Sequence, residues 1–237
     1  PALNEARDRV RAAVVNSGLN WPSCRITVSL SPAWLPKRGS GLDVSIAVAI
    51  LAADGQIPAH DAAKIVALGE LGLDGRIRPA IGALATALAL RRATGVVPEV
   101  VVAGPVDCLS LRSVPGLEVF EASTLRSLVA RLRGEQSDDE TDVDLGAVQL
   151  VSDVGAVDVV EKDIADVRGQ PGAKRALEIA AAGGHHVALL GRAGVGKTLI
   201  AERLPSLLPD LGDEQALEVT SIHQLTGKGA SIAAGGL

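Results

Sequence analysis

The residues with the clearest chemical potential lie in the stretch GRAGVGKT, Gly191–Thr198. Its pattern, G-x-x-x-x-G-K-[ST], is typical of loops that hold the phosphates of a nucleotide. Glycines let such a backbone curl so that successive N–H groups point inward, and a following helix adds partial positive charge at its N-terminus. In this pattern Lys197 reaches the β- and γ-phosphates, and the Thr198 hydroxyl binds magnesium. The sequence therefore predicts a site for ATP and Mg²⁺.

The elements that must position this loop stand on both sides of it. The apolar run HVALLG, ending at Gly191, predicts a strand, and a helix is expected to begin at Lys197 and to end near Pro205. Before the strand, PGAKRALEIAAAGG has Pro171 in its first turn and glycines at its end, which is typical of a helix. We interpret His185 and His186 as a pair at the strand edge near the nucleotide rather than as metal ligands.

Composition limits what the rest of the chain can be. The 237 residues include no Met, no Tyr and one Phe, so cores must be built from Ala, Val, Leu and Ile. Because the chain lacks an initiator Met and opens in a predicted helix, we expect it to be a fragment of a longer protein. Cys24 and Cys108 fit no metal spacing, and we expect buried free thiols rather than a disulfide between them. No membrane span or signal peptide is visible, so the expected location is the cytoplasm.

The net charge of −5 is unevenly distributed along the chain. Residues 135–163 hold ten acidic residues and one basic residue, and without them 22 basic and 18 acidic residues leave a net charge of +4. Runs of like charge usually stay solvated. We therefore interpret 135–162 as an acidic linker that follows a mildly basic first region. Such a basic excess is compatible with nucleic-acid binding without establishing it.

Residues 1–134 alternate between helical and extended patterns, which indicates a layered α/β domain. The predicted helices cover 4–18, 43–53, 81–95, 106–112 and 123–133, and the predicted strands cover 24–30, 64–71, 99–104 and 117–122. Asn4 is the expected cap of the first helix, and Arg7 and Arg11 are expected on its solvated face. Trp34 lies in a Pro-rich loop, where it either stacks on a nucleic-acid base or packs over a core edge; we expect packing.

These stretches together resemble a known family. The segment from Asp166 to Thr198, DVRGQPGAKRALEIAAAGGHHVALLGRAGVGKT, resembles the start of the AAA+ module of magnesium-chelatase-like ATPases, and the ComM/YifB group in particular. The first region is similar to that group's N-terminal domain in three stretches: EARDRVRAAVVNSG, RITVSLSPAWLPKRGSGLDVSIAVAILAADGQI and LGELGLDGRIRPAIGALATAL. The resemblance extends to about Leu225. It is specific because two unrelated domains occur in the family's order.

The resemblance implies an architecture and a set of site residues. Residues 1–134 would form a Lon-protease-like domain (ribosomal S5 domain 2-like), residues 135–162 a linker, and residues 163–237 part of a P-loop AAA+ domain. The segment 167–170 would lie near the adenine, and Lys197 would be catalytic with Thr198 on the metal. The implied nucleotide-binding residues are Val167, Gly169, Gln170, Gly191, Arg192, Ala193, Gly194, Val195, Gly196, Lys197 and Thr198.

The resemblance also implies a function. Proteins of the ComM type are similar to hexameric AAA+ motors and drive DNA branch migration during natural transformation. The expected partners are therefore branched or single-stranded DNA and further copies of the chain, assembled as a hexamer with ATP. Two alternatives remain open at this point. One is an ATP-driven protein remodeller of the magnesium-chelatase type, and the other is a non-catalytic nucleotide-binding module.

Proteolysis is a separate possibility, because Lon-type proteases use a Ser–Lys pair. The serine position of such enzymes corresponds to Gly41, with Ser40 one residue away, and the lysine position corresponds to Leu84. No lysine occurs between Lys64 and Lys162. A serine without a neighbouring base is a weak nucleophile at neutral pH. We therefore expect the first domain to serve as a scaffold or as a DNA-contacting module.

The residues after the loop generate a first prediction. Hydrolysis in this class needs acids that hold magnesium, usually at the end of a second strand. No apolar strand ending in two acids follows Thr198. Residues 1–237 should therefore bind ATP with little turnover. A steady-state ATPase assay on this chain checks the expectation, and robust turnover that depends on Lys197 would contradict it.

Overall fold

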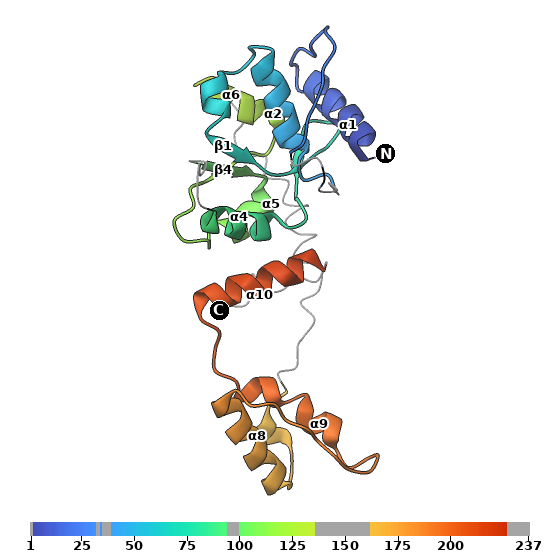
Figure 1. Cartoon of the computed structure of the whole chain (residues 1–237), viewed down its shortest axis with the longest axis vertical. Helices are drawn as coiled ribbons and strands as arrows, with labels where there is room; N and C mark the ends of the chain where they lie inside the picture. Colours follow the sequence, from blue (N-terminus) through green and yellow to red (C-terminus); the bar gives the residue numbers. More distant parts are fainter. Residues whose placement is uncertain (1, 32–33, 35–38, 94–99, 136–161, 227–237) are drawn as a thin grey trace. The chain divides into compact units, whose positions relative to one another are not determined.

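The computed structural model describes residues 2–31, 34, 39–93, 100–135 and 162–226 (Figure 1). The chain divides into two compact units, the first from residues 1–154 with 217–236 and the second from residues 155–216. Most of the predicted linker, 135–162, and the tail after Thr226 lie outside the described residues. Within the described ranges, no helix is long and apolar enough to cross a membrane.

A parallel sheet organises the first unit. Its strands are β1 (Ile65–Ala67), β4 (Val100–Ala103) and β5 (Val119–Glu121), in the order β1-β4-β5. Parallel neighbours need crossover connections, and α4 (Ala83–Arg92) and α5 (Pro105–Leu111) lie in those connections. A separate antiparallel pair, β2 (Glu70–Leu71) with β3 (Ile77–Arg78), precedes α4. The prediction of an α/β fold with interleaved strands and helices is confirmed.

Helices cover both faces of this sheet (Figure 1). On one face lie α1 (Ala2–Asn16), α2 (Asp43–Ala53) and α6 (Leu125–Leu132), and on the other lie α4 and α5. The side chains of β4 alternate accordingly: Val102 packs in the first core, and Val101 and Ala103 pack in the second. This alternation is the period of two that any strand imposes. Both faces are apolar because both are covered.

One buried carboxylate joins three elements of the first core. Asp43, at the start of α2, is 1% exposed. Its oxygens accept hydrogen bonds from Arg9 Nε at 2.8 Å and Arg9 Nη2 at 3.3 Å, and from the backbone N–H of Leu71 at 3.4 Å. A buried charge is tolerated only when it is paired and hydrogen-bonded. Asp43 therefore links α2 to α1 through Arg9 and to β2 through Leu71.

Several sequence predictions differ from the structure. The predicted strand 24–30 is wrong, because this segment is described without regular secondary structure, although Ile26 and Leu30 pack partly against the first core. The predicted strand 64–71 divides into β1 and β2. The helix α1 already begins at Ala2, so Asn4 lies inside it and does not cap it. The other predicted elements of this unit appear within a few residues of their expected positions.

The second unit is built from short helices. They are η1 (Ile164–Asp166), α8 (Pro171–Gly183), α9 (Lys197–Ala201) and η2 (Leu204–Leu207). The helix α10 (Asp213–Leu225) follows in sequence, and its residues from Leu217 onward belong to the first unit, where Leu217 packs in the core around Leu84. The prediction of α8 is confirmed. The helix from Lys197 ends at Ala201, earlier than predicted, and Pro205 lies in the 3₁₀ turn η2. The helix α10 and the short α3 (Ala59–Ala62) were not predicted from the sequence.

Asp107 is a half-buried acid of the first unit, and no cation pairs with it in the described structure. Its Oδ2 accepts a hydrogen bond from the Ala80 backbone N–H at 2.8 Å. Burial raises the pKa of this carboxyl from 3.8 to about 6, and the Ala80 hydrogen bond offsets part of that increase. Desolvation disfavours the charged form, so the folded state holds the Asp107 proton more tightly than the unfolded chain does.

This difference predicts a pH-dependent stability. Because the folded pKa lies above the unfolded value, the Asp107 contribution is fully present below about pH 4 and is lost as the pH rises through about 6. Asp107→Asn keeps an acceptor for Ala80 and removes the charge. Its advantage over wild type in unfolding free energy should grow by about 1 kcal/mol between pH 5 and pH 7.5. Urea unfolding at the two pH values measures this, with exposed Asp8→Asn as the control; an advantage independent of pH would contradict it.

Candidate phosphate-binding site

A small apolar core holds the ends of the candidate site together. Val167, Leu177 and Ile200 are buried at its centre, and they come from the segment before α8, from α8 and from α9. The partly buried residues around them are Ile164, Ala173, Leu189, Leu204 and Leu207. Val167 was predicted near the adenine, and the structure places its side chain in this core at 2% exposure. The segment 167–170 and the loop 191–198 are thus anchored by one cluster.

The loop itself depends on glycines in left-handed conformations. Gly194 has φ +83° and Gly196 has φ +86°. A residue with a Cβ rarely adopts such angles, whereas glycine does so at no steric cost. The two glycines turn the chain tightly before α9 begins at Lys197. The sequence predicted that glycines let the loop backbone curl, and these two conformations agree with that prediction.

Lys197 folds back onto the loop that precedes it. Its ammonium Nζ donates to the carbonyl oxygens of Gly191 at 2.8 Å and Arg192 at 2.7 Å. No carboxylate pairs with this ammonium within the described part of the chain. Its hydrogen-bond partners are neutral carbonyl groups, which solvate the charge without neutralising it. A phosphate group would offer a stronger, charge-assisted hydrogen bond.

Thr198 follows in the first turn of α9 and is exposed. Its hydroxyl has no hydrogen-bond partner among the residues that the structure describes, so the oxygen is free to meet a metal ion or water. The helix is only five residues long, and the macrodipole of so short a helix is small. The loop N–H groups and Lys197 must therefore supply most of the attraction for an anion. Lys197 and Thr198 thus fit the phosphates and Mg²⁺ that the motif predicts.

Two family models match the chain in sequence. Residues 1–102 match the model described as "Subunit ChlI of Mg-chelatase", and residues 163–234 match "Magnesium chelatase, subunit ChlI". Relatives include an uncharacterized protein of Mycobacterium tuberculosis, 45% identical over 95% of this chain. YifB of Escherichia coli is 38% identical over 94% of the chain, and "Competence protein ComM" of Haemophilus influenzae is 37% identical over 94%. The chain spans 42% of the length of each.

The chain belongs to the ComM/YifB family. This membership confirms the resemblance drawn from the sequence. It also supports an ATPase-type function for the family's full-length proteins. What the whole protein acts on is a matter of proposal, because the chain covers less than half of its relatives.

Polar contacts connect the end of α9, which follows the glycine loop of this ComM/YifB-family chain, with the segment before α8. Arg203 Nη1 donates to the Leu199 carbonyl oxygen at 2.8 Å, and its Nη2 lies 3.8 Å from Asp166 Oδ2. Lys162 Nζ lies 2.7 Å from Glu202, and this hydrogen bond lowers the pKa of the Glu202 carboxyl. These contacts connect η1 with the end of α9. Sequence reasoning missed Arg203, which carries no motif signal.

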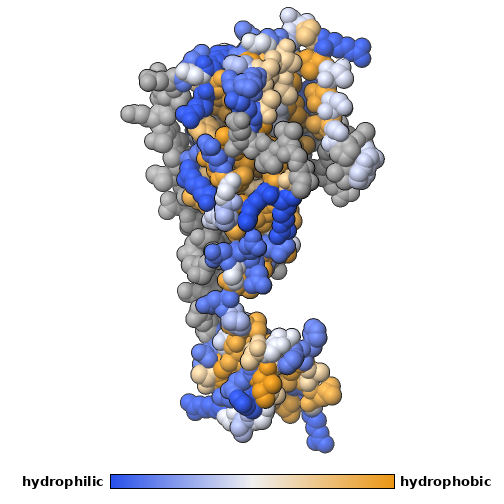
Figure 2. All heavy atoms as spheres, turned by 60° about the vertical axis from the view of Figure 1, so that its left-hand side comes forward, coloured by the Kyte–Doolittle hydropathy of each residue, from blue (hydrophilic) through white to orange (hydrophobic). Residues whose placement is uncertain are grey.

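The strand predicted to lead into the loop is wrong. Residues 186–191 are described without regular secondary structure, and Leu190 is 94% exposed. Figure 2 shows apolar side chains at the surface of this unit. The exposed apolar residues of this unit include Ile179, Leu199, Leu208 and Leu211. His185 closes α8, because its backbone N–H donates to Ala180 at 2.9 Å. No metal-binding cluster of His, Cys, Asp and Glu occurs in the described residues.

Two further residue groups of the first unit were weighed from the sequence. At the protease-like position, the Ser40 hydroxyl donates to the Glu70 carboxylate, and Leu84 is fully buried.

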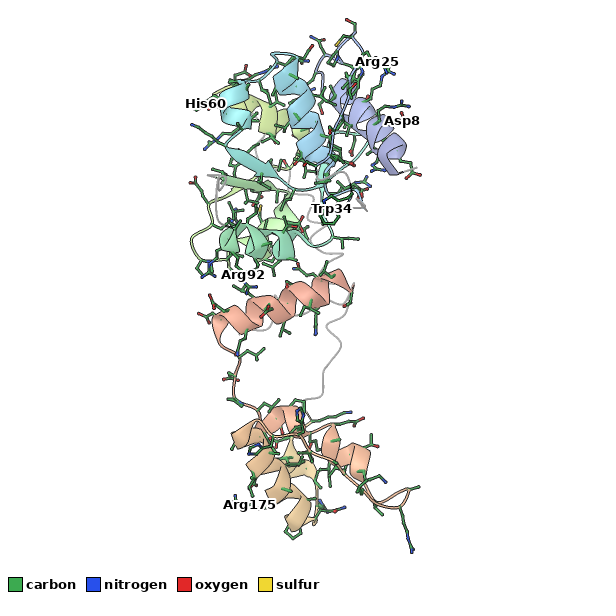
Figure 3. The ribbon with its side chains drawn as sticks, viewed as in Figure 1. Asp8, Arg25, Trp34, His60, Arg92 and Arg175 are labelled. Atoms are coloured by element: carbon green, nitrogen blue, oxygen red, sulfur yellow. The ribbon has the colours of Figure 1, made fainter. Side chains whose placement is uncertain are left out.

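Trp34, labelled in Figure 3, is 80% exposed, so the expectation that it packs over a core edge is wrong. Arg7 and Arg11 are exposed, as predicted, and Arg7 pairs with Asp8 at 3.2 Å. Cys24 and Cys108 are free thiols, as expected; Cys108 is buried, whereas the expectation that Cys24 is buried is wrong, because Cys24 is exposed.

The left-handed loop glycines predict a specific cost of substitution. Gly196→Ala places a Cβ at φ +86°, which should cost about 1–2 kcal/mol of stability or force the loop to refold. Either response misdirects the loop N–H groups and should weaken MgATP binding. Gly172→Ala is the matched control, since Gly172 lies in α8 with open space around its Cβ position. Thermal melts and calorimetric titration compare the two variants, and equal ATP affinity in both would contradict the prediction.

Proposed function

We propose that this chain is the ATP-binding part of a DNA motor of the ComM/YifB family, one that drives branch migration in DNA uptake and recombination. The observation that carries the proposal is the glycine loop 191–198, in which Lys197 has neutral carbonyl partners and can turn to a phosphate. Family membership supports an ATPase, and the relative named "Competence protein ComM" supports a link to DNA uptake. The motor acts in the cytoplasm.

ATP with Mg²⁺ supplies the energy of phosphoanhydride hydrolysis to such a motor. In this chain the loop N–H groups would bind the phosphates, Lys197 would bridge to the β- and γ-phosphates, and Thr198 would hold the metal. The backbone of the segment from Val167 to Gln170 would flank the base, since the Val167 side chain lies in the core and the Gln170 side chain is held by Val195. We further propose that copies of the full-length protein assemble as a hexamer with ATP and act on branched or single-stranded DNA.

The first unit has a Lon-protease-like fold in this proposal, and it works without a protease dyad. An added Cβ at Gly41 would lie 3.2 Å from the Ala80 Cβ, so the serine-equivalent position lies close to the segment that leads to Leu84. Leu84 is fully buried and apolar, and it offers no base. The net charge of +4 outside the acidic segment supports a DNA-contacting role for the first unit.

A second candidate function is protein remodelling of the magnesium-chelatase type. The descriptions of both matching family models favour it, since each names a magnesium chelatase subunit. The two functions differ in their response to DNA. Stimulation of the full-length ATPase by DNA supports the motor, and indifference to DNA supports the remodeller.

The deciding experiment uses the full-length protein on a labelled four-way DNA junction with and without ATP. Wild type should resolve the junction only with ATP. Lys197→Ala should lower ATP turnover at least about 100-fold and abolish strand exchange, because it removes the cation from the phosphates. Lys174→Ala removes a lysine from α8 of the same unit and should leave both activities intact. ATP hydrolysis that leaves the junction intact would contradict the DNA-motor proposal and favour the protein-remodelling function.

A further inference from the structure

Gln170 has an unusual backbone conformation at the edge of the proposed nucleotide site. Its φ of +54° makes it the one non-glycine residue with positive φ among the described residues. Side chains with a Cβ disfavour this left-handed region. Its own carbonyl oxygen accepts from the Lys174 N–H at 3.1 Å, so Gln170 is anchored to the start of α8. Strained residues of this kind often belong to functional sites.

The side chain of Gln170 reaches the phosphate loop. Its amide Nε2 donates to the carbonyl oxygen of Val195 at 2.9 Å. Among the described residues, Gln170 supplies the hydrogen bond that this carbonyl accepts. An added Cβ on Gly196 would lie 3.7 Å from the same amide nitrogen, so the loop passes close to Gln170 without a clash.

The direction of this contact determines the direction of a neighbouring donor. The Val195 carbonyl and the Gly196 N–H belong to one peptide group, and in a trans peptide these two bonds point in opposite directions. A carbonyl held toward Gln170 therefore turns the Gly196 N–H away from Gln170. Left-handed Gly196 makes that peptide orientation accessible. Without the amide, the described structure offers this carbonyl no other hydrogen-bond donor.

We propose that Gln170 is a positioning residue of the phosphate loop, which acts through the Val195 peptide and makes no contact with the base. The inference rests on the proposed nucleotide-binding function. It assigns the two ends of the loop to different side chains: Lys197 holds the carbonyls of Gly191 and Arg192, and Gln170 holds that of Val195. Loss of Gln170 should therefore weaken binding of any ligand through its phosphates, whatever base it carries.

Two substitutions separate this role from a structural one. Gln170→Gly removes the amide and relieves the positive φ, so the melting temperature should be unchanged or higher. Gln170→Glu keeps the length of the side chain and replaces the donor with an acceptor that repels the carbonyl. In the full-length protein, both variants should weaken Mg²⁺-bound ATP about tenfold, which is the loss typical of one hydrogen bond. Glu178→Gln on α8 serves as the control.

The test compares three ligands by calorimetric titration: a non-hydrolysable ATP analogue, the corresponding GTP analogue and tripolyphosphate, each with Mg²⁺. An equal loss of affinity for all three supports the inference. A loss confined to the ATP analogue overturns it, because that result assigns Gln170 to the base. Unchanged affinities also overturn it while nucleotide binding stands. If wild-type protein bound none of the three, the proposed function itself would fail, and the inference with it.

Discussion

The phosphate loop depends on one constraint, the direction in which its peptide groups point. Each N–H aimed at an anion leaves a carbonyl aimed away from it, and that carbonyl needs a donor. Lys197 and Gln170 supply donors at the two ends of the loop. The apolar core around Leu177 and Ile200 holds the elements from which these donors arise. The core and the two donors of the second unit thus hold a few peptide groups of the loop in defined orientations.

The first unit solves a different problem, which is how to bury charge in a core with almost no aromatic residues. Asp43 lies at the junction of three elements and is neutralised by Arg9. Removal of one partner of such a pair leaves an unpaired buried charge, which typically costs about 3–5 kcal/mol. Asp107 lacks a cation in the described structure, and its pKa rises to about 6 in consequence. Burial therefore produces a structural link at the fully buried, paired Asp43 and a titrating group at the half-buried, unpaired Asp107.

Much of the fold follows from local patterns in the sequence. The helices α2 and α8 begin and end close to the predicted residues, because apolar spacing and end signals such as Pro171 are local. The segments 24–30 and 186–191 failed as strands for a shared reason. An apolar alternation, as in the first, or a continuous apolar run, as in the second, predicts an extended chain, but a strand also needs hydrogen-bonded neighbours, and a single sequence does not show them. The Gln170–Val195 contact was missed because it joins residues 25 positions apart that carry no shared motif.

The two loop donors must behave differently when a phosphate arrives. The Lys197 ammonium exchanges two neutral carbonyl acceptors for a charged one, and charge-assisted hydrogen bonds are roughly twice as strong as neutral ones. Only the free-energy difference between the carbonyl-bonded and the phosphate-bonded state of Lys197 contributes to affinity. In the phosphate-bonded state, water must supply the hydrogen bonds that the Gly191 and Arg192 carbonyls lose. The Gln170 bond needs no such exchange, because it lies on the far side of the Val195 peptide from the Gly196 donor. In the proposed function, phosphate affinity therefore depends in part on the Gln170 side chain, which acts from the far side of the Val195 peptide.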